Sequence, residues 1–152
     1  MKSEPEEFSI DDLRKIGTSP WEGVRNYQAR NFMVQDMKPG DLILFYHSNA
    51  EPTGVAGLAK VASEPIVDPT QFDKKSDYHD PKSKKEEPRW RCVKVSYVDH
   101  FENFVTLAEM REEAPLKKML LLQKGQRLSV QPVRPKEFAH ILKMGQPKKG
   151  TP

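Results

Sequence analysis

The chain of 152 residues is poor in cysteine and has no long apolar run. Its one cysteine, Cys92, cannot form an intrachain disulfide, which favours a reducing compartment. No run is long enough to span a membrane, and residues 1–5 have no signal-peptide core. We therefore expect a soluble, intracellular protein, cytoplasmic if bacterial and nuclear if eukaryotic, with no membrane partner and monomeric.

A strong excess of charge of one sign is also missing. There are 25 Lys and Arg against 22 Asp and Glu, a formal net charge of +3. A mildly basic balance is compatible with a nucleic-acid partner without requiring one. Mean hydropathy is −0.75, yet strong apolar runs remain, and the length suits one domain. We place that domain at residues 1–145, followed by a basic tail at 146–152.

The motifs of common enzymes and metal sites are absent as well. The histidines are far apart in the sequence, without a His-x-x-x-His pair, and one cysteine cannot build a structural zinc site. There is no P-loop and no Gly-x-Ser-x-Gly motif. We expect no catalysis, no metal and no cofactor. A Ser48 or Cys92 nucleophile with a histidine base stays open, because such groups assemble in space.

One segment, residues 21–32, concentrates the side chains that recognise nucleic acids. Arginine and asparagine carry forked hydrogen-bonding groups that match base edges and phosphates, and tryptophan and tyrosine offer flat faces for stacking. Asn26 is a suitable N-cap for a helix that starts at Tyr27. The alternative is an ordinary capped surface helix beside a buried tryptophan.

Local patterns predict the elements around this segment. Ser9 and the Thr106-Leu107-Ala108-Glu109 capping box each indicate the start of a helix. Apolar runs and alternation predict the strands, and proline and glycine mark the ends. The expected helices cover residues 9–17, 27–33, a short segment after 106, and 135–144. The expected strands cover residues 41–48, 54–62, 90–98 and 127–133.

The order of these elements bears on the fold class. Helices and strands do not alternate as they would in a doubly wound fold. An α+β fold fits better, with a mixed sheet curled into a small barrel and helices at its ends. Residues 41–48 and 54–62 should pair as an antiparallel hairpin, and residues 127–133 should join the same sheet. The charged segment 73–91, with Pro81 and Pro88, is predicted to be a solvated loop.

Several sequence blocks, taken in order, resemble a known family. They are Lys2-Ser3-Glu4-Pro5, Trp21 with residues 23–31, residues 45–49, Pro69 with Asp80-Pro81-Lys82, and residues 127–132. From Lys2 to about Met144 the chain closely resembles the EVE domain family. The resemblance implies a PUA-like fold related to the YTH and ASCH domains, a mostly antiparallel β-barrel with flanking helices. It also implies a non-enzymatic pocket that reads DNA or RNA, in particular a modified base.

The same resemblance implies which residues line this pocket. They come from the first strand, the central segment, the end of the hairpin strand and the late strand: Lys2, Ser3, Tyr46, His47, Ser48, Trp21, Arg25, Asn26, Tyr27, Arg127, Ser129 and Gln131. Apart from the resemblance, we expect Trp90, in the charged loop, to be a lid over this pocket. Aromatic faces, amide and hydroxyl groups, and cations are what a flipped base and its phosphate require. The alternative function is a protein-binding or small-ligand-binding module that uses the same cleft.

Some of these residues also have a structural interpretation. Trp21 and Tyr46 suit a hydrophobic core, and His47 suits a structural hydrogen bond. Arg25 has Glu22 and Asp41 as alternative partners to a phosphate. Trp90 follows a proline in the charged loop, so a surface anchor is the alternative to a lid.

Overall fold

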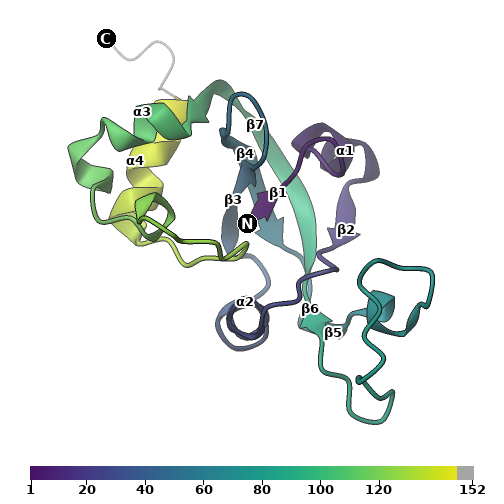
Figure 1. Cartoon of the computed structure of the whole chain (residues 1–152). Coiled ribbons are helices and arrows are strands. Elements are labelled where there is room, and N and C mark those ends of the chain that lie inside the picture. Colours follow the sequence, from purple (N-terminus) through teal and green to yellow (C-terminus); the bar gives the residue numbers. More distant parts are fainter. Residues whose placement is uncertain (147–152) are drawn as a thin grey trace.

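A five-stranded sheet forms the centre of the computed structural model, which describes residues 1–146 (Figure 1). Its strands, in spatial order, are β1 (Lys2–Ser3), β3 (Leu42–His47), β4 (Gly54–Val61), β7 (Lys94–Thr106) and β2 (Thr18–Pro20). Strands β1 and β3 are parallel, and the other neighbours are antiparallel. A separate pair, β5 (Ile66–Val67) and β6 (Arg91–Cys92), lies beside the sheet.

Within residues 1–146, four α-helices flank the sheet, and side-chain caps stabilise the start of three of them. Helix α1 (Ile10–Ile16) is capped by Ser9, α2 (Tyr27–Asn31) by Asn26, and α3 (Leu107–Arg111) by Thr106. Helix α4 (Pro135–Gly145) starts with a proline. Proline is favourable there because the N–H groups of a first turn have no acceptor within the helix, so the N–H that proline lacks is not needed. Short 3₁₀ turns cover Pro69–Phe72, Ala114–Leu116 and Leu120–Leu122.

The predicted hairpin is confirmed. Strands β3 and β4 pair from Leu42 opposite Lys60 to His47 opposite Gly54, with a shift in register after Phe45. Further shifts between β4 and β7 let the long β7 bend as it crosses the sheet. The curl therefore comes from bulges in the longest strands.

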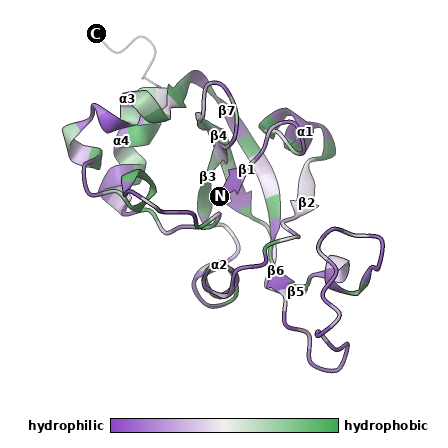
Figure 2. Cartoon of the chain, in the orientation of Figure 1, coloured by the Kyte–Doolittle hydropathy of each residue, from purple (hydrophilic) through white to green (hydrophobic). Residues whose placement is uncertain are grey.

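Both faces of β3 are covered, as its unbroken apolar run predicts. Ile43 and Phe45 belong to a core cluster with Ile10 and Met33, on the side of α1 and α2. Leu44 and Tyr46 point to the other face, into a cluster with residues of β7, α3 and α4. Figure 2 shows hydrophobic residues along β3 and a largely hydrophilic loop around β5 and β6. The charged segment 73–91 is an irregular loop up to β6, as predicted.

Two predicted element boundaries are wrong. Helix α2 does not end near residue 33 but runs on as a π-helix, Phe32–Asp36. The strand predicted at 90–98 is interrupted at Val93, whose carbonyl accepts a hydrogen bond from the Trp21 N–H at 2.9 Å. On one side of Val93 the chain pairs with β5, and on the other it enters the main sheet and continues to Thr106.

The predicted strand at 127–133 is also wrong. This segment forms no strand and does not join the sheet. It touches the sheet edge through one backbone hydrogen bond, from the Lys2 N–H to the Ser129 carbonyl at 2.8 Å. Its apolar alternation reflects Val130, which is buried in the core, while Pro132 has no N–H for a ladder.

The structure describes only the first residue of the basic tail predicted at 146–152. Residues 147–152 of the predicted basic tail lie outside the described residues. The single domain at 1–145 stays a prediction. Across residues 1–146, no helix has both the length and the apolar character needed to cross a membrane.

Candidate nucleic-acid interface

A cavity of about 970 Å³ opens where β1 and β3 end. Its walls come from segments far apart in the sequence: residues 2–8, 19–25, 48–49, Tyr78 and 126–129. Of the predicted site residues, seven line it: Lys2, Ser3, Trp21, Arg25, Ser48, Arg127 and Ser129. The volume is within the range of small-molecule pockets and is ample for a nucleobase.

Backbone hydrogen bonds hold three of these segments together. The Ser48 N–H donates to the Ser3 carbonyl at 2.9 Å, and the Lys2 N–H donates to the Ser129 carbonyl at 2.8 Å. The Ser3 hydroxyl donates to the carbonyl of Phe8 at 2.6 Å, which leaves its oxygen as an acceptor. Ser3, Ser48 and Ser129 therefore lie on neighbouring segments of the cavity wall, beside the parallel β1–β3 pair.

Asp68, just after β5, anchors Gly23 and Arg25 of the segment 19–25. Its Oδ2 accepts hydrogen bonds from the Gly23 N–H at 2.8 Å and from Arg25 Nη1 at 3.1 Å. Its side chain is 2% exposed. Burial raises the pKa of this carboxyl, but hydrogen bonds from Thr70, Gly23 and Arg25 outweigh burial, so the net shift is downward. The partner of Arg25 is thus Asp68, and the predicted alternatives Glu22 and Asp41 are wrong.

Arg25 also holds the charged loop in place. Its Nε and Nη2 donate to the carbonyl of Tyr78 at 2.9 and 2.6 Å, and Nη2 donates to Thr70 Oγ1 at 2.9 Å. A guanidinium has five N–H donors, and here they join residues that are about 50 positions apart. The tip of the loop at Tyr78 is therefore brought to the cavity rather than left in solvent.

The three aromatic residues of the cavity differ in what they expose. Trp21 is 8% exposed and packs edge-on against Phe45, with ring centroids 5.5 Å apart, and against Phe8 at 6.4 Å. Tyr78 is 41% exposed. Trp21 therefore belongs both to the core and to the cavity wall, and Tyr78 is the largely open aromatic surface.

The charges around the cavity nearly balance. Its cations are Lys2, Arg25 and Arg127, and its acids are Glu4, Glu7 and Glu22. Burial lowers the pKa of Lys2, and burial followed by the charge of Asp68 raises the pKa of Glu22. Because Arg25 is already paired with Asp68, the cavity offers few cations to phosphates and suits a neutral group.

Asn26, Tyr27 and Trp90 lie outside this cavity. The Asn26 side chain accepts from the Ala29 N–H at 3.0 Å and caps α2. Tyr27 stacks on Trp90 with ring centroids 4.8 Å apart, and Arg30 lies over the Tyr27 ring at 4.7 Å. Trp90 is 6% exposed, and its indole N–H donates to Asp80 at 2.8 Å. The alternative of a surface anchor is wrong, because Trp90 is buried against Tyr27 of α2, and Trp90 does not line this cavity.

Tyr46, His47 and Gln131 also lie away from the cavity lining. Tyr46 is buried in the core on the α4 side of the sheet. His47 Nε2 accepts from the Ile10 N–H at 3.1 Å, and burial, the largest influence, lowers the pKa of His47. Gln131 donates to the carbonyl of Leu128 at 2.7 Å. These side chains are engaged within the fold.

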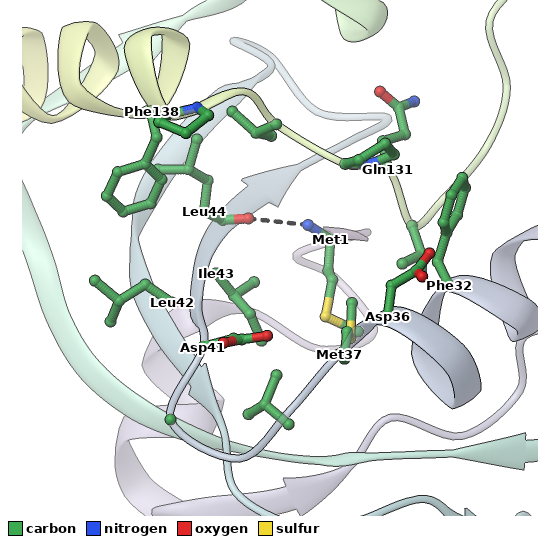
Figure 3. Close-up of a pocket in the computed structure, with 16 residues that line it drawn as sticks. Met1, Phe32, Asp36, Met37, Asp41, Leu42, Ile43, Leu44, Gln131 and Phe138 are labelled. Carbon is green, nitrogen blue, oxygen red and sulfur yellow. Dashed lines mark hydrogen bonds between the residues drawn. The ribbon is translucent and has the colours of Figure 1, made fainter.

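Gln131 lines a second cavity, of about 650 Å³, beside Met1 and the start of β3 (Figure 3). Apolar residues such as Phe32, Ile43 and Phe138 dominate it, and the Met1 amino group donates to the Leu44 carbonyl at 3.0 Å across it. The charged side chains of its lining are Asp36 and Asp41, both acids. Such a surface repels phosphates, so this cavity is a poor candidate for a nucleic-acid site.

Sequence reasoning did not single out Tyr78 or Asp68. Tyr78 is the sole tryptophan, tyrosine or phenylalanine in residues 73–89, and that isolation was the available signal. Asp68 directly precedes Pro69, which is part of one of the family-like blocks, but nothing local links it to Arg25. Both were missed because their partners are distant in the sequence.

Comparisons with known proteins show the family of this chain. The EVE domain model matches residues 1–144. Thymocyte nuclear protein 1 of Danio rerio is 44% identical over 163 residues, which cover 95% of this chain and 70% of that protein. The human thymocyte nuclear protein 1 is 42% identical, with 95% of this chain and 72% of the relative covered.

Solved structures agree with the sequence matches. A hypothetical protein from Leishmania major has a TM-score of 0.90 at 50% identity, covering 95% of this chain and 91% of that one. Human THYN1 protein in complex with DNA containing 5-methylcytosine has a TM-score of 0.90 at 41% identity, covering 97% and 96%. These likenesses confirm the predicted fold class, a mixed α+β fold with a curled, half-barrel sheet and flanking helices. The chain belongs to the EVE domain family.

Proposed function

We propose that this chain binds DNA that carries a modified base, with the base held in the 970 Å³ cavity and without catalysis. The observation that carries the proposal is the cavity itself, in which hydroxyls, aromatic surface and nearly balanced charges meet in one place. A member of the same family, human THYN1 protein, forms a complex with DNA containing 5-methylcytosine. We take 5-methylcytosine as the first ligand to test.

The composition of the cavity favours a base over a stretch of backbone. Phosphate-binding grooves gather cations, whereas here three acids offset three cations. A flipped base needs a stacking face and polar groups for its Watson–Crick edge. Ser3, Ser48 and Ser129 supply such polar groups, and Lys2 and Arg127, which also line the cavity, are the cations for the adjoining phosphates.

The site divides into contact and support. Of the seven lining residues named above, Lys2, Ser3, Ser48, Arg127 and Ser129 make the contacts, Trp21 forms part of the wall, and Arg25 is held by Asp68. The other six predicted residues, Asn26, Tyr27, Tyr46, His47, Trp90 and Gln131, hold the walls through a helix cap, stacking, core packing and hydrogen bonds. Base contacts specify and phosphate contacts position, so the serines should govern selectivity and the cations affinity.

The groups that catalysis would use are occupied or inert. His47 accepts a backbone hydrogen bond from Ile10 through Nε2, so it is not free to act as a base for Ser48. Burial raises the pKa of Cys92 to about 12, so its thiol is not a nucleophile at neutral pH. Within residues 1–146, no group of three or more His, Cys, Asp or Glu is placed to hold a metal ion.

The proposed DNA binding also implies a location. A protein that binds genomic DNA acts in the nucleus of a eukaryote or in the cytoplasm of a bacterium.

The test compares oligonucleotides that differ at one cytosine. Fluorescence anisotropy should show tighter binding of the 5-methylcytosine oligonucleotide than of its unmodified twin. Arg127→Gln should weaken both, since it removes a phosphate contact, while the matched variant Arg91→Gln, on β6 away from the cavity, should bind like the wild type. Equal affinity for modified and unmodified DNA would contradict the proposal. A preference for a peptide or metabolite would favour the alternative ligand-binding module.

A further inference from the structure

The cavity needs an aromatic face for a base, and its three aromatic residues are not equally able to supply one. Trp21 packs edge-on against Phe8, with ring centroids 6.4 Å apart, and against Phe45 at 5.5 Å. With 8% of its surface exposed, Trp21 has little ring surface left for a base. Tyr78 is 41% exposed and lines the same cavity. Stacking therefore falls to the residue with an open face.

Tyr78 is held rigidly enough to act as a platform. Its carbonyl accepts two hydrogen bonds from Arg25, at 2.9 and 2.6 Å, and its N–H donates to the Ser76 hydroxyl at 3.0 Å. Arg25 is in turn anchored to the buried Asp68 at 3.1 Å. A side chain whose backbone is fixed on both sides loses little entropy when a ligand stacks on it.

The chain leaves room for the Tyr78 ring at Gly23. Gly23 has a φ of +89°, and a Cβ added there would lie 2.8 Å from the ring. Any other residue at this position would have to displace the ring and adopt a backbone conformation that L-residues disfavour. The guanidinium of Arg25 lies 5.7 Å from the ring centroid, within the range of a cation–π contact.

We propose that Tyr78 is the residue on which the flipped base stacks, and that Arg25 positions Tyr78 rather than binding a phosphate. The inference rests on the proposed function and names the residue that carries its affinity. It explains why Tyr78, a lone aromatic residue in a highly charged loop, is bonded at the cavity wall to Arg25, which lies 53 positions earlier in the chain.

The first experiment measures binding of Tyr78 variants to the 5-methylcytosine oligonucleotide. Tyr78→Phe keeps the ring and should bind within about twofold of the wild type. Tyr78→Leu has no ring and should bind about 5- to 150-fold more weakly, the factor that corresponds to one base–aromatic stack. Thermal melting of each variant checks the fold. A folded Tyr78→Leu variant with wild-type affinity overturns the inference.

A second measurement needs no truncated variant. With ¹³C-labelled tyrosine, the Tyr78 ring signals are assigned as those missing from the Tyr78→Phe spectrum. Adding the methylated oligonucleotide should move them upfield through the ring current of the base, while Tyr97, which is hydrogen-bonded to His100, serves as the internal reference. Tight binding without this shift overturns the stacking role alone. A wild type that binds no modified oligonucleotide refutes the proposed function, and the inference falls with it.

Discussion

Trp21 lies on the boundary between the core and the cavity, so its substitution separates packing from recognition. It is buried against Phe45 and Phe8, and its backbone N–H is bonded to Val93. Packing of this kind stabilises the fold whether or not a base is bound. The sequence predicts a stacking role with a core role as the alternative, and the edge-on geometry favours the core role.

We expect Trp21→Ala to lower the free energy of unfolding by about 3–5 kcal/mol, the usual cost of truncating a packed tryptophan. Urea denaturation at pH 7 measures it. Tyr78→Leu is the control, because its ring is more exposed and its loss should cost clearly less. A Trp21→Ala variant that unfolds at the wild-type midpoint would show that the ring is not part of the core and would return it to the list of stacking residues.

Asp68 is the residue whose protonation matters to the fold. Its pKa is lowered in the folded state, so the stability it contributes is fully present above the unfolded pKa near 3.8. That contribution is lost as pH falls from there through the folded pKa. Asp68→Asn should be less stable than the wild type at pH 7, by up to about 3–5 kcal/mol because Arg25 loses a buried partner. The difference should narrow below about pH 4.

Urea denaturation of both proteins at several pH values from 7 to 3 checks this dependence. The comparison isolates Asp68, because the other carboxyl groups titrate in both proteins. A difference that stays constant down to pH 3 would mean that Asp68 has no lowered pKa in the folded protein.

At the scale of elements, the loop between β5 and β6 is tied down by a buried glutamine. Gln71 is fully buried; its Nε2 donates to the carbonyls of Asp68 and Trp90, and its Oε1 accepts from Ser83 and from the Trp90 N–H. The sequence predicts a solvated loop, yet the residues near its two ends share this buried network of hydrogen bonds. This anchor is what allows Tyr78 to be placed at the cavity.

Gln71→Leu keeps a similar volume but leaves those backbone groups without partners. We expect a loss of about 1–3 kcal/mol for a buried group left unsatisfied, together with faster hydrogen exchange confined to about residues 71–91. Exchange followed by mass spectrometry measures this, with the amides of β4 as the internal reference. Unchanged exchange in the loop would show that Gln71 does not anchor it.

At the scale of the whole molecule, the small net charge limits how strongly DNA can be held by its phosphates. With a formal charge of +3 and a nearly neutral cavity, we expect about three phosphate contacts to a single strand. The slope of log affinity against log salt concentration should then be roughly −2.

Anisotropy titrations between about 50 and 300 mM salt, a range over which the Debye length shortens, measure this slope. Replacing Lys74, Lys75, Lys82, Lys84 and Lys85 with glutamine is the matched comparison, and it should leave the slope nearly unchanged. A much steeper slope that these substitutions abolish would make the charged loop the main DNA-binding surface.

The sequence by itself determined the features that depend on neighbouring residues. The Ser9 and Thr106 caps and the β3–β4 hairpin follow from interactions within a few positions or from one unbroken apolar run. The collinear blocks also sufficed to identify the family. Local periodicity misled at 127–133, because alternation reports burial and cannot report whether a strand is available to pair with.

Only the tertiary structure decided what the chemically capable residues do. Arg25, which the sequence predicts to bind a phosphate, contacts Asp68 and Tyr78, which are 43 and 53 positions away. Trp90 is buried under Tyr27, and His47 is bonded to Ile10. The role of a polar or aromatic side chain depends on which distant groups surround it, and the packing of the sheet and the loop determines those neighbours.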